Sequence, residues 1–153
     1  MSVRPIALLA ALVALLILPS TALAAPKKAF IGLSASTYSV AENSGTFQLT
    51  LQRTGNSRTQ VAVPVSVTGG TATNGNQYSF TSPQTVTFMA GETTKKLAVT
   101  INDNSTLNPP NKTVIFHLGT PVPVTGSAGI KTANATLTIL LLIVSAVTIA
   151  AAI

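Results

Sequence analysis

Residues 46–53, Thr-Phe-Gln-Leu-Thr-Leu-Gln-Arg, alternate apolar and polar side chains without interruption. This alternation places Phe47, Leu49 and Leu51 on one face of an extended chain and the Thr and Gln side chains on the other. Turn-forming residues bound the stretch, with Asn43-Ser44-Gly45 before it and Thr54-Gly55-Asn56-Ser57 after it. The stretch therefore predicts a β-strand with one face in a core and the other in water.

The same kind of pattern recurs on both sides of this strand, in short runs separated by Gly, Asn, Ser and Pro. The further strands that it predicts are Phe30–Val40, Gln60–Thr68, Thr85–Met89, Thr94–Ile101, Thr113–Leu118 and Lys131–Ile139. No segment of this middle region has a helical period. About seven antiparallel strands at this spacing predict an all-β, immunoglobulin-like sandwich over residues 31–139, preceded by a linker at 25–30.

Proline and tyrosine refine this interpretation. Pro64 interrupts the run of valines in the strand 60–68 and cannot donate a ladder hydrogen bond, which favours an edge strand or a bulge. We interpret Tyr38 and Tyr78 as packing residues with a hydrogen-bonded hydroxyl group rather than as binding aromatics.

The composition argues against an enzyme. Glu42, Glu92 and Asp103 are the only acidic residues, His117 is the only histidine, and cysteine is absent. A catalytic triad needs a base that an acid orients toward a nucleophile. His117 falls in the strand phase opposite to Phe116 and Leu118, so we expect it on the solvent face. No catalytic residues and no cofactor are therefore predicted.

The N-terminus has the features of a secretory leader. Arg4 gives a positive start, residues 6–18 are apolar, and Ala22-Leu23-Ala24 supplies small residues for cleavage. We expect residues 1–24 to be a signal peptide and the protein to be exported. Without Arg4, eight of the nine basic residues remain against three acidic ones, for a net charge of +5. These bases are scattered without interleaved aromatics, which argues against nucleic-acid binding.

Several strings, in their order and spacing, resemble the Calx-beta domain, a family known from sodium/calcium exchangers, an integrin and bacterial surface proteins. They are Tyr38-Ser39-Val40-Ala41-Glu42-Asn43, Leu51-Gln52-Arg53-Thr54-Gly55, Gly70-Thr71-Ala72-Thr73, Gln77-Tyr78, Val86-Thr87-Phe88, Ala90-Gly91-Glu92-Thr93, Ile101-Asn102-Asp103-Asn104, Val114-Ile115-Phe116-His117-Leu118 and Ala135-Thr136-Leu137-Thr138-Ile139. The resemblance covers roughly residues 31–139. It implies a seven-stranded sandwich that is usually extracellular.

The resemblance also implies a calcium site at one end of the sandwich, where loop carboxylates supply hard oxygen ligands. Glu42 and Asp103 fall on positions that resemble family ligands. The other positions depart from the pattern, because Gln77 and Asn104 replace acids and residues 108–112 end in Lys112 without a carboxylate. We therefore predict a neutral polar cluster without a cofactor, with a weak calcium site at Glu42 and Asp103 as the alternative.

The C-terminal segment, residues 140–153, is apolar and free of charge, whereas members of the family have acidic residues after the last strand. Four interpretations stay open: a short membrane anchor, a processed sorting tail, an extension that packs on the domain or a partner, and a truncated or frame-shifted end. Taken together, the sequence predicts a non-catalytic, exported or surface-displayed structural or adhesion module. Its partner would be a protein or a surface glycan, and the sequence does not indicate an oligomeric state.

Overall fold

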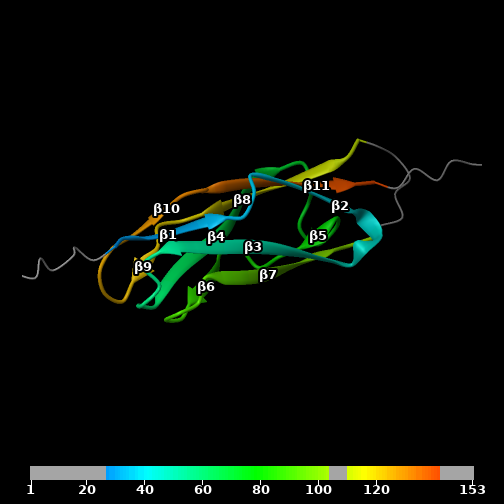
Figure 1. Cartoon of the computed structure of the whole chain (residues 1–153). Coiled ribbons are helices and arrows are strands. Elements are labelled where there is room, and N and C mark those ends of the chain that lie inside the picture. The colour runs from blue at the N-terminus through cyan, green and yellow to red at the C-terminus, as the bar shows by residue number, and fades with distance from the viewer. Residues whose placement is uncertain (1–26, 104–109, 142–153) are drawn as a thin grey trace, which may run out of the picture.

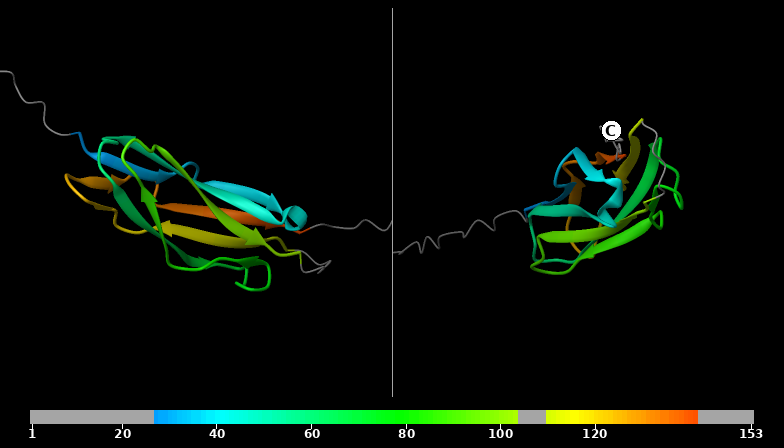
Figure 2. Two further views of the ribbon diagram at one scale, coloured as in Figure 1. Left: turned by 90° about the horizontal axis from the view of Figure 1, so that it is seen from below. Right: turned by 90° about the vertical axis from the view of Figure 1, so that its right-hand side faces the viewer.

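The computed structural model describes residues 27–103 and 110–141. The predicted leader (residues 1–24) and the last twelve residues of the apolar tail (142–153) lie outside the described residues, as do residues 104–109. Within the described part, eleven strands form two sheets. Figure 1 shows the elongated body that they build, and the end-on view at the right of Figure 2 shows the two sheets as separate layers. The all-β sandwich is confirmed.

The first sheet has five strands in the order β10-β1-β3-β7-β5. Their bounds are Ala128–Ile130, Ala29–Leu33, Thr46–Gly55, Thr94–Ile101 and Tyr78–Ser79. The second sheet has the order β2-β11-β8-β4-β6, with β9 also paired to β4. Their bounds are Thr37–Ala41, Asn134–Leu140, Lys112–Leu118, Val61–Gly70, Gln84–Phe88 and, for β9, Val122–Pro123. A 3-10 turn, η1, spans Glu42–Ser44.

The core lies between the sheets and follows the alternation of the sequence. Leu49 and Leu51 of β3 are fully buried, and they face Val61, Val63 and Val65 of β4, which are also fully buried. The inward residues of β7, β8 and β11 add Leu97, Val99, Ile101, Val114, Phe116, Leu118, Ala135, Leu137 and Ile139. The buried residues of β1, β5 and β6 and Phe80 complete the core. Each large buried side chain contributes about 1.5–3 kcal/mol of transfer free energy. The apolar faces predicted from the sequence are confirmed.

The predicted first strand, 30–40, is wrong as a single edge strand. It is divided into β1, which pairs with β3, and β2, which pairs with β11 in the other sheet. Two hydrogen bonds fix the crossing: the N–H of Ser34 donates to Thr50 O (2.9 Å), and Ser36 O accepts from the N–H of Thr136 (2.9 Å). The chain thus leaves one layer and enters the other within three residues.

The last predicted strand, 131–139, is likewise shorter than expected and is preceded by a separate strand on the opposite sheet. β10 pairs parallel with β1, and β11 pairs parallel with β2. The prediction that all strands are antiparallel is therefore wrong at these two pairings. The physical reason is that the first and last parts of the domain run side by side in the same direction and cross between sheets together.

Pro64 does not lie at an edge, which corrects that expectation. β4 has β6 on one side and both β8 and β9 on the other. Pro64 is tolerated because it lies between the pairing to β9, which ends at Ala62, and the pairing to β8, which begins at Val65. Its carbonyl oxygen accepts from the N–H of Gly119 (2.8 Å) where the chain crosses this gap. The register shift in β4 occurs later, between Val67 and Gly69.

Among the described residues, no helix is long and apolar enough to cross a membrane. The tail interpretations concern residues outside this part, and they stay predictions. β1 begins at Ala29, inside the predicted linker 25–30, and β11 ends at Leu140.

Candidate functional site

Several loops meet at the end of the sandwich that carries η1, at the right of Figure 1. The N–H of Ile101, the last residue of β7, donates to Gly45 O just after η1 (3.0 Å). The N–H of Asn102 donates to Gln77 O (3.0 Å) in the loop before β5. We call the described residues Glu42–Gly45, Gln77, Asn102, Asp103, Asn111 and Lys112 the η1 end. Glu42 and Asp103, which are far apart in the sequence, therefore lie at the same end of the domain.

The two carboxylates differ in their surroundings. Glu42 is buried, with 3% of its surface exposed, because β2 leads directly into the 3-10 turn on which it lies. Asp103 is exposed and follows the end of β7. Both residues interact with other groups. Glu42 lies just before β3 and Asp103 just after β7, and these two strands pair in the first sheet, which places both residues at the same end.

Two further side-chain oxygens of the η1 end are engaged within the protein. Gln77 Oε1 accepts from the N–H of Thr73 (2.7 Å), and Asn111 Oδ1 accepts from the N–H of Leu141 (3.2 Å). Calcium takes six to eight oxygen ligands, preferably with several carboxylates. In the described ranges, no three Asp, Glu, His or Cys side chains gather as a metal-binding group. These residues do not fit a complete calcium site, and calcium binding at Glu42 and Asp103 stays a prediction.

His117 lies on β8, and its ring is oriented by an amide. Its Nδ1 lies 2.7 Å from Asn134 Oδ1 on the neighbouring strand β11, in register with it. The histidine is half-buried rather than fully on the surface. An amide oxygen can fix the ring's tautomer, but it does not stabilise an imidazolium ion as a carboxylate does.

The two tyrosines serve packing. The hydroxyl of Tyr38 accepts from the N–H of Ala35 (2.9 Å) and shares a hydrogen bond with Ser34 Oγ (2.8 Å). Its ring meets Phe47 edge-on, with centroids 5.2 Å apart. Tyr78 is buried with 4% of its surface exposed, and this burial raises the pKa of its phenol.

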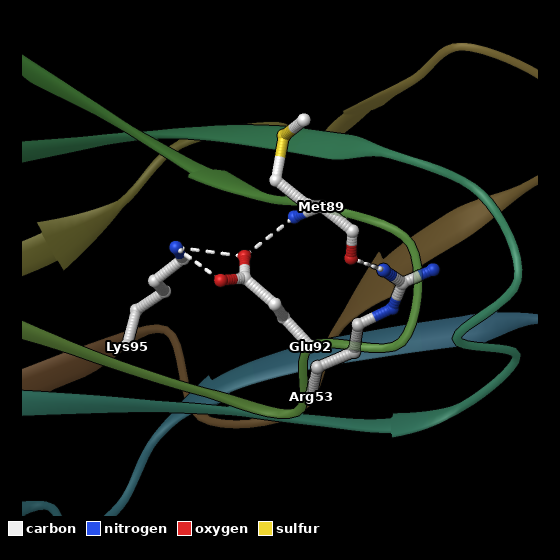
Figure 3. Close-up of polar contacts among 4 residues, drawn as sticks. All are labelled: Arg53, Met89, Glu92 and Lys95. Carbon is white, nitrogen blue, oxygen red and sulfur yellow. Dashed lines mark hydrogen bonds and ion pairs between the residues drawn. The ribbon is translucent and has the colours of Figure 1, made fainter.

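Charged side chains gather at the opposite end, where the turn between β6 and β7 lies (Figure 3). Glu92 Oε1 accepts from Lys95 Nζ (2.8 Å), and Glu92 Oε2 accepts from the N–H of Met89 (2.7 Å). The hydrogen bond from Lys95, followed by that from Met89, lowers the pKa of the Glu92 carboxyl. The three residues close the turn that connects β6 of the second sheet to β7 of the first, so the Glu92 carboxylate has a structural role.

Arg53 is a residue whose burial the sequence analysis missed. It continues the inward phase of Leu49 and Leu51 and is only 3% exposed, and this burial lowers the pKa of its guanidinium. Its Nε donates to Asn56 O (2.9 Å) and its Nη1 to Met89 O (3.5 Å). The signal was present, because strand parity places residue 53 on the same face as 49 and 51.

Comparisons with known proteins agree with this architecture. The family model described as the Calx-beta domain matches residues 26–141, more than half of the chain. The chain therefore belongs to the Calx-beta domain family, as the resemblance implied. A comparison with curated proteins gave no match.

Solved structures show the same fold. The apo form of the Calx CBD1 domain superposes with a TM-score of 0.64 at 19% identity, covering 75% of this chain and 98% of that one. The Calx CBD2 domain gives 0.65 at 19% identity, with 72% and 85% covered. CBD12 of CALX1.1, named as a calcium-binding domain, gives 0.60 at 21% identity, with 74% and 44% covered. At these identities the likeness establishes the fold alone.

Proposed function

We propose that this chain is a non-catalytic Calx-beta module that is exported and serves a structural or adhesive role at a cell surface. The proposal rests on one observation: several of the few reactive side chains are engaged in contacts within the fold. Glu92 closes a turn with Lys95, His117 pairs with Asn134, and Arg53 is held by backbone carbonyls. The inward faces of both sheets are filled with apolar side chains, and what the domain offers to a partner is its polar outer surface.

Export and adhesion are tested separately. The full chain is expressed in a secreting host, and mass spectrometry of the exported protein should give a mature N-terminus at Ala25. Beads coated with the purified chain should attach to cell or matrix surfaces, whereas beads coated with heat-unfolded chain should not. Retention of residues 1–24 would contradict export, and equal attachment of folded and unfolded chain would contradict adhesion by the domain.

The second candidate is a weak calcium-responsive module, favoured by the meeting of Glu42 and Asp103 at the η1 end. Calorimetric titration of the full chain with Ca²⁺ decides between the two. Our proposal expects neither heat nor a shift in melting temperature. Heat that disappears in the double variant Glu42→Gln/Asp103→Asn, but remains in Glu92→Gln, would establish the second candidate. Glu92→Gln is the matched control because it removes one carboxylate at the opposite end.

A further inference from the structure

A hollow of about 230 Å³ lies on the outer face of the first sheet. Its floor is Gly32 in β1, and Phe30 of the same strand and Ser34, which directly follows the strand, also line it. Gln52 lies opposite Gly32 on β3, and Thr54 lies opposite Phe30. The hollow is therefore bounded by two strands whose register fixes the side chains of Phe30, Gln52 and Thr54 relative to the backbone of Gly32.

The segment that follows β10 forms the second wall. The N–H of Lys131 donates to Ile31 O (2.8 Å), and the N–H of Leu33 donates to Thr132 O (3.1 Å), so this segment runs along β1. It approaches Gly32 so closely that a Cβ there would lie 2.9 Å from Thr132 N. Glycine is thus required at this position, and the floor of the hollow is backbone rather than side chain.

The lining combines an apolar surface with neutral hydrogen-bonding groups. Phe30 is 40% exposed, and Lys28 Nζ lies over its ring, 5.6 Å from the centroid. Around it stand the Gln52 amide and the Thr54 hydroxyl. Ligand sites commonly pair an apolar or aromatic surface with a few polar groups that orient the ligand. A pyranose ring has matching chemistry, because one face carries C–H groups and the rim carries hydroxyls.

The charge of the residues around the hollow favours one class of sugar over others. Among the described residues that line the hollow, Lys131 is a cation and none is a carboxylate. Lys28 adds a second positive charge beside Phe30. An ammonium group attracts a carboxylate in a partly enclosed site more strongly than it does in open water. A sugar that bears a carboxylate therefore fits this site better than a neutral one.

We propose that this hollow binds a hexuronic acid unit of an acidic polysaccharide. The inference rests on the proposed adhesive function and names its ligand class. The sugar's apolar face lies against Phe30 and the backbone of Gly32, Gln52 and Thr54 hydrogen-bond its hydroxyls, and Lys131 pairs with its carboxylate.

The test uses the full chain and two probes: a hexasaccharide that alternates glucuronic acid with N-acetylglucosamine, and a neutral hexasaccharide of N-acetylglucosamine. Saturation-transfer NMR and calorimetry report binding. We expect the acidic probe to bind and the neutral probe to bind at least about tenfold more weakly, a ratio that should shrink as salt screens Lys131. Absence of binding by the acidic probe, or equal affinity for both probes, would overturn the inference.

Matched variants locate the site. Gln52→Ala and Lys131→Gln should each weaken the acidic probe at least about fivefold, since each removes a direct contact. Gln48→Ala and Lys96→Gln are their controls, because both are exposed on the same outer face of the sheet outside the hollow. Melting temperatures of all four variants should match that of the parent. Equal losses in variants and controls would refute the assigned site.

Bead attachment separates this inference from the proposed function. Attachment that Gln52→Ala and Lys131→Gln abolish supports both. Attachment that neither variant alters leaves adhesion in place and refutes the hollow as its site. If folded beads attach no better than unfolded ones while the acidic probe still binds at the hollow, adhesion fails and the saccharide site stands.

Discussion

Arg53 Nε donates to Asn56 O at 2.9 Å, which binds the buried end of β3 to the turn that follows it. The same guanidinium reaches Met89 O, 36 positions further along the chain, at 3.5 Å. One side chain therefore holds two turns, the β3–β4 turn and the β6–β7 turn, each of which connects the two sheets. Because β3 and β6 are otherwise not paired, this contact links the layers at the end opposite η1 (Figure 3).

Replacement of Arg53 should be costly, and the cost should depend on what replaces it. Arg53→Ala removes both hydrogen bonds and leaves a cavity, so we expect a loss of about 2–4 kcal/mol in the free energy of unfolding. Arg53 Nη2 is buried and has no hydrogen-bond partner among the described residues. Arg53→Met keeps the stem and removes this buried donor, so it should lose less. Urea denaturation measures both, and a larger loss in Arg53→Met would contradict this account.

Glu92 should make the stability of the fold depend on acidity. Hydrogen bonds from Lys95 and Met89 lower its pKa in the folded state below the ordinary value of 4.5. A lowered carboxyl pKa contributes stability above the unfolded value, and this contribution is lost as the pH falls through the folded value. The parent should therefore melt above Glu92→Gln at pH 7, and the difference should narrow below pH 4.5. Thermal melting across pH 3–7 measures it, and a difference independent of pH would refute the assignment.

Gly70 and Gly75 should respond differently to alanine. Both have a positive φ, of 122° and 87°, so alanine strains the backbone at either position by about 1–3 kcal/mol. At Gly70 the added Cβ would also collide with the carbonyl oxygen of Thr113 on β8, whereas at Gly75 it meets no described atom within 4 Å. We expect Gly70→Ala to be more destabilising by about 2 kcal/mol or more, since backbone must shift. Equal melting temperatures would show that β4 and β8 can separate at this point without cost.

The strands with four or more alternating residues could be predicted from the sequence. β7 matches its predicted bounds, Thr94–Ile101, and β3 extends two residues beyond its predicted end. β5, β9 and β10 were missed because two or three residues carry too little periodicity to stand out. They are strands only because a neighbouring strand offers them hydrogen bonds.

The candidate site, like the strands, could be predicted from the sequence only in part. The resemblance to the family predicted that Glu42 and Asp103 lie at one end of the sandwich, and calcium binding by them stays a prediction. The engagement of Gln77 Oε1 by Thr73 and of Asn111 Oδ1 by Leu141 could not be anticipated. The first contact closes a local turn and the second joins residues 30 positions apart, and both engage oxygens that the sequence counts as available.

The sequence by itself determined which side chains face the interior of each long strand and that few reactive groups are present, because side-chain direction alternates with every residue. Only the tertiary structure decided that residues 29–41 divide between two sheets, that β10 and β11 run parallel to their partners, and that a hollow lies over Gly32. The reason is physical: alternation sets the face on which a side chain lies, but it does not specify which strand pairs beside it.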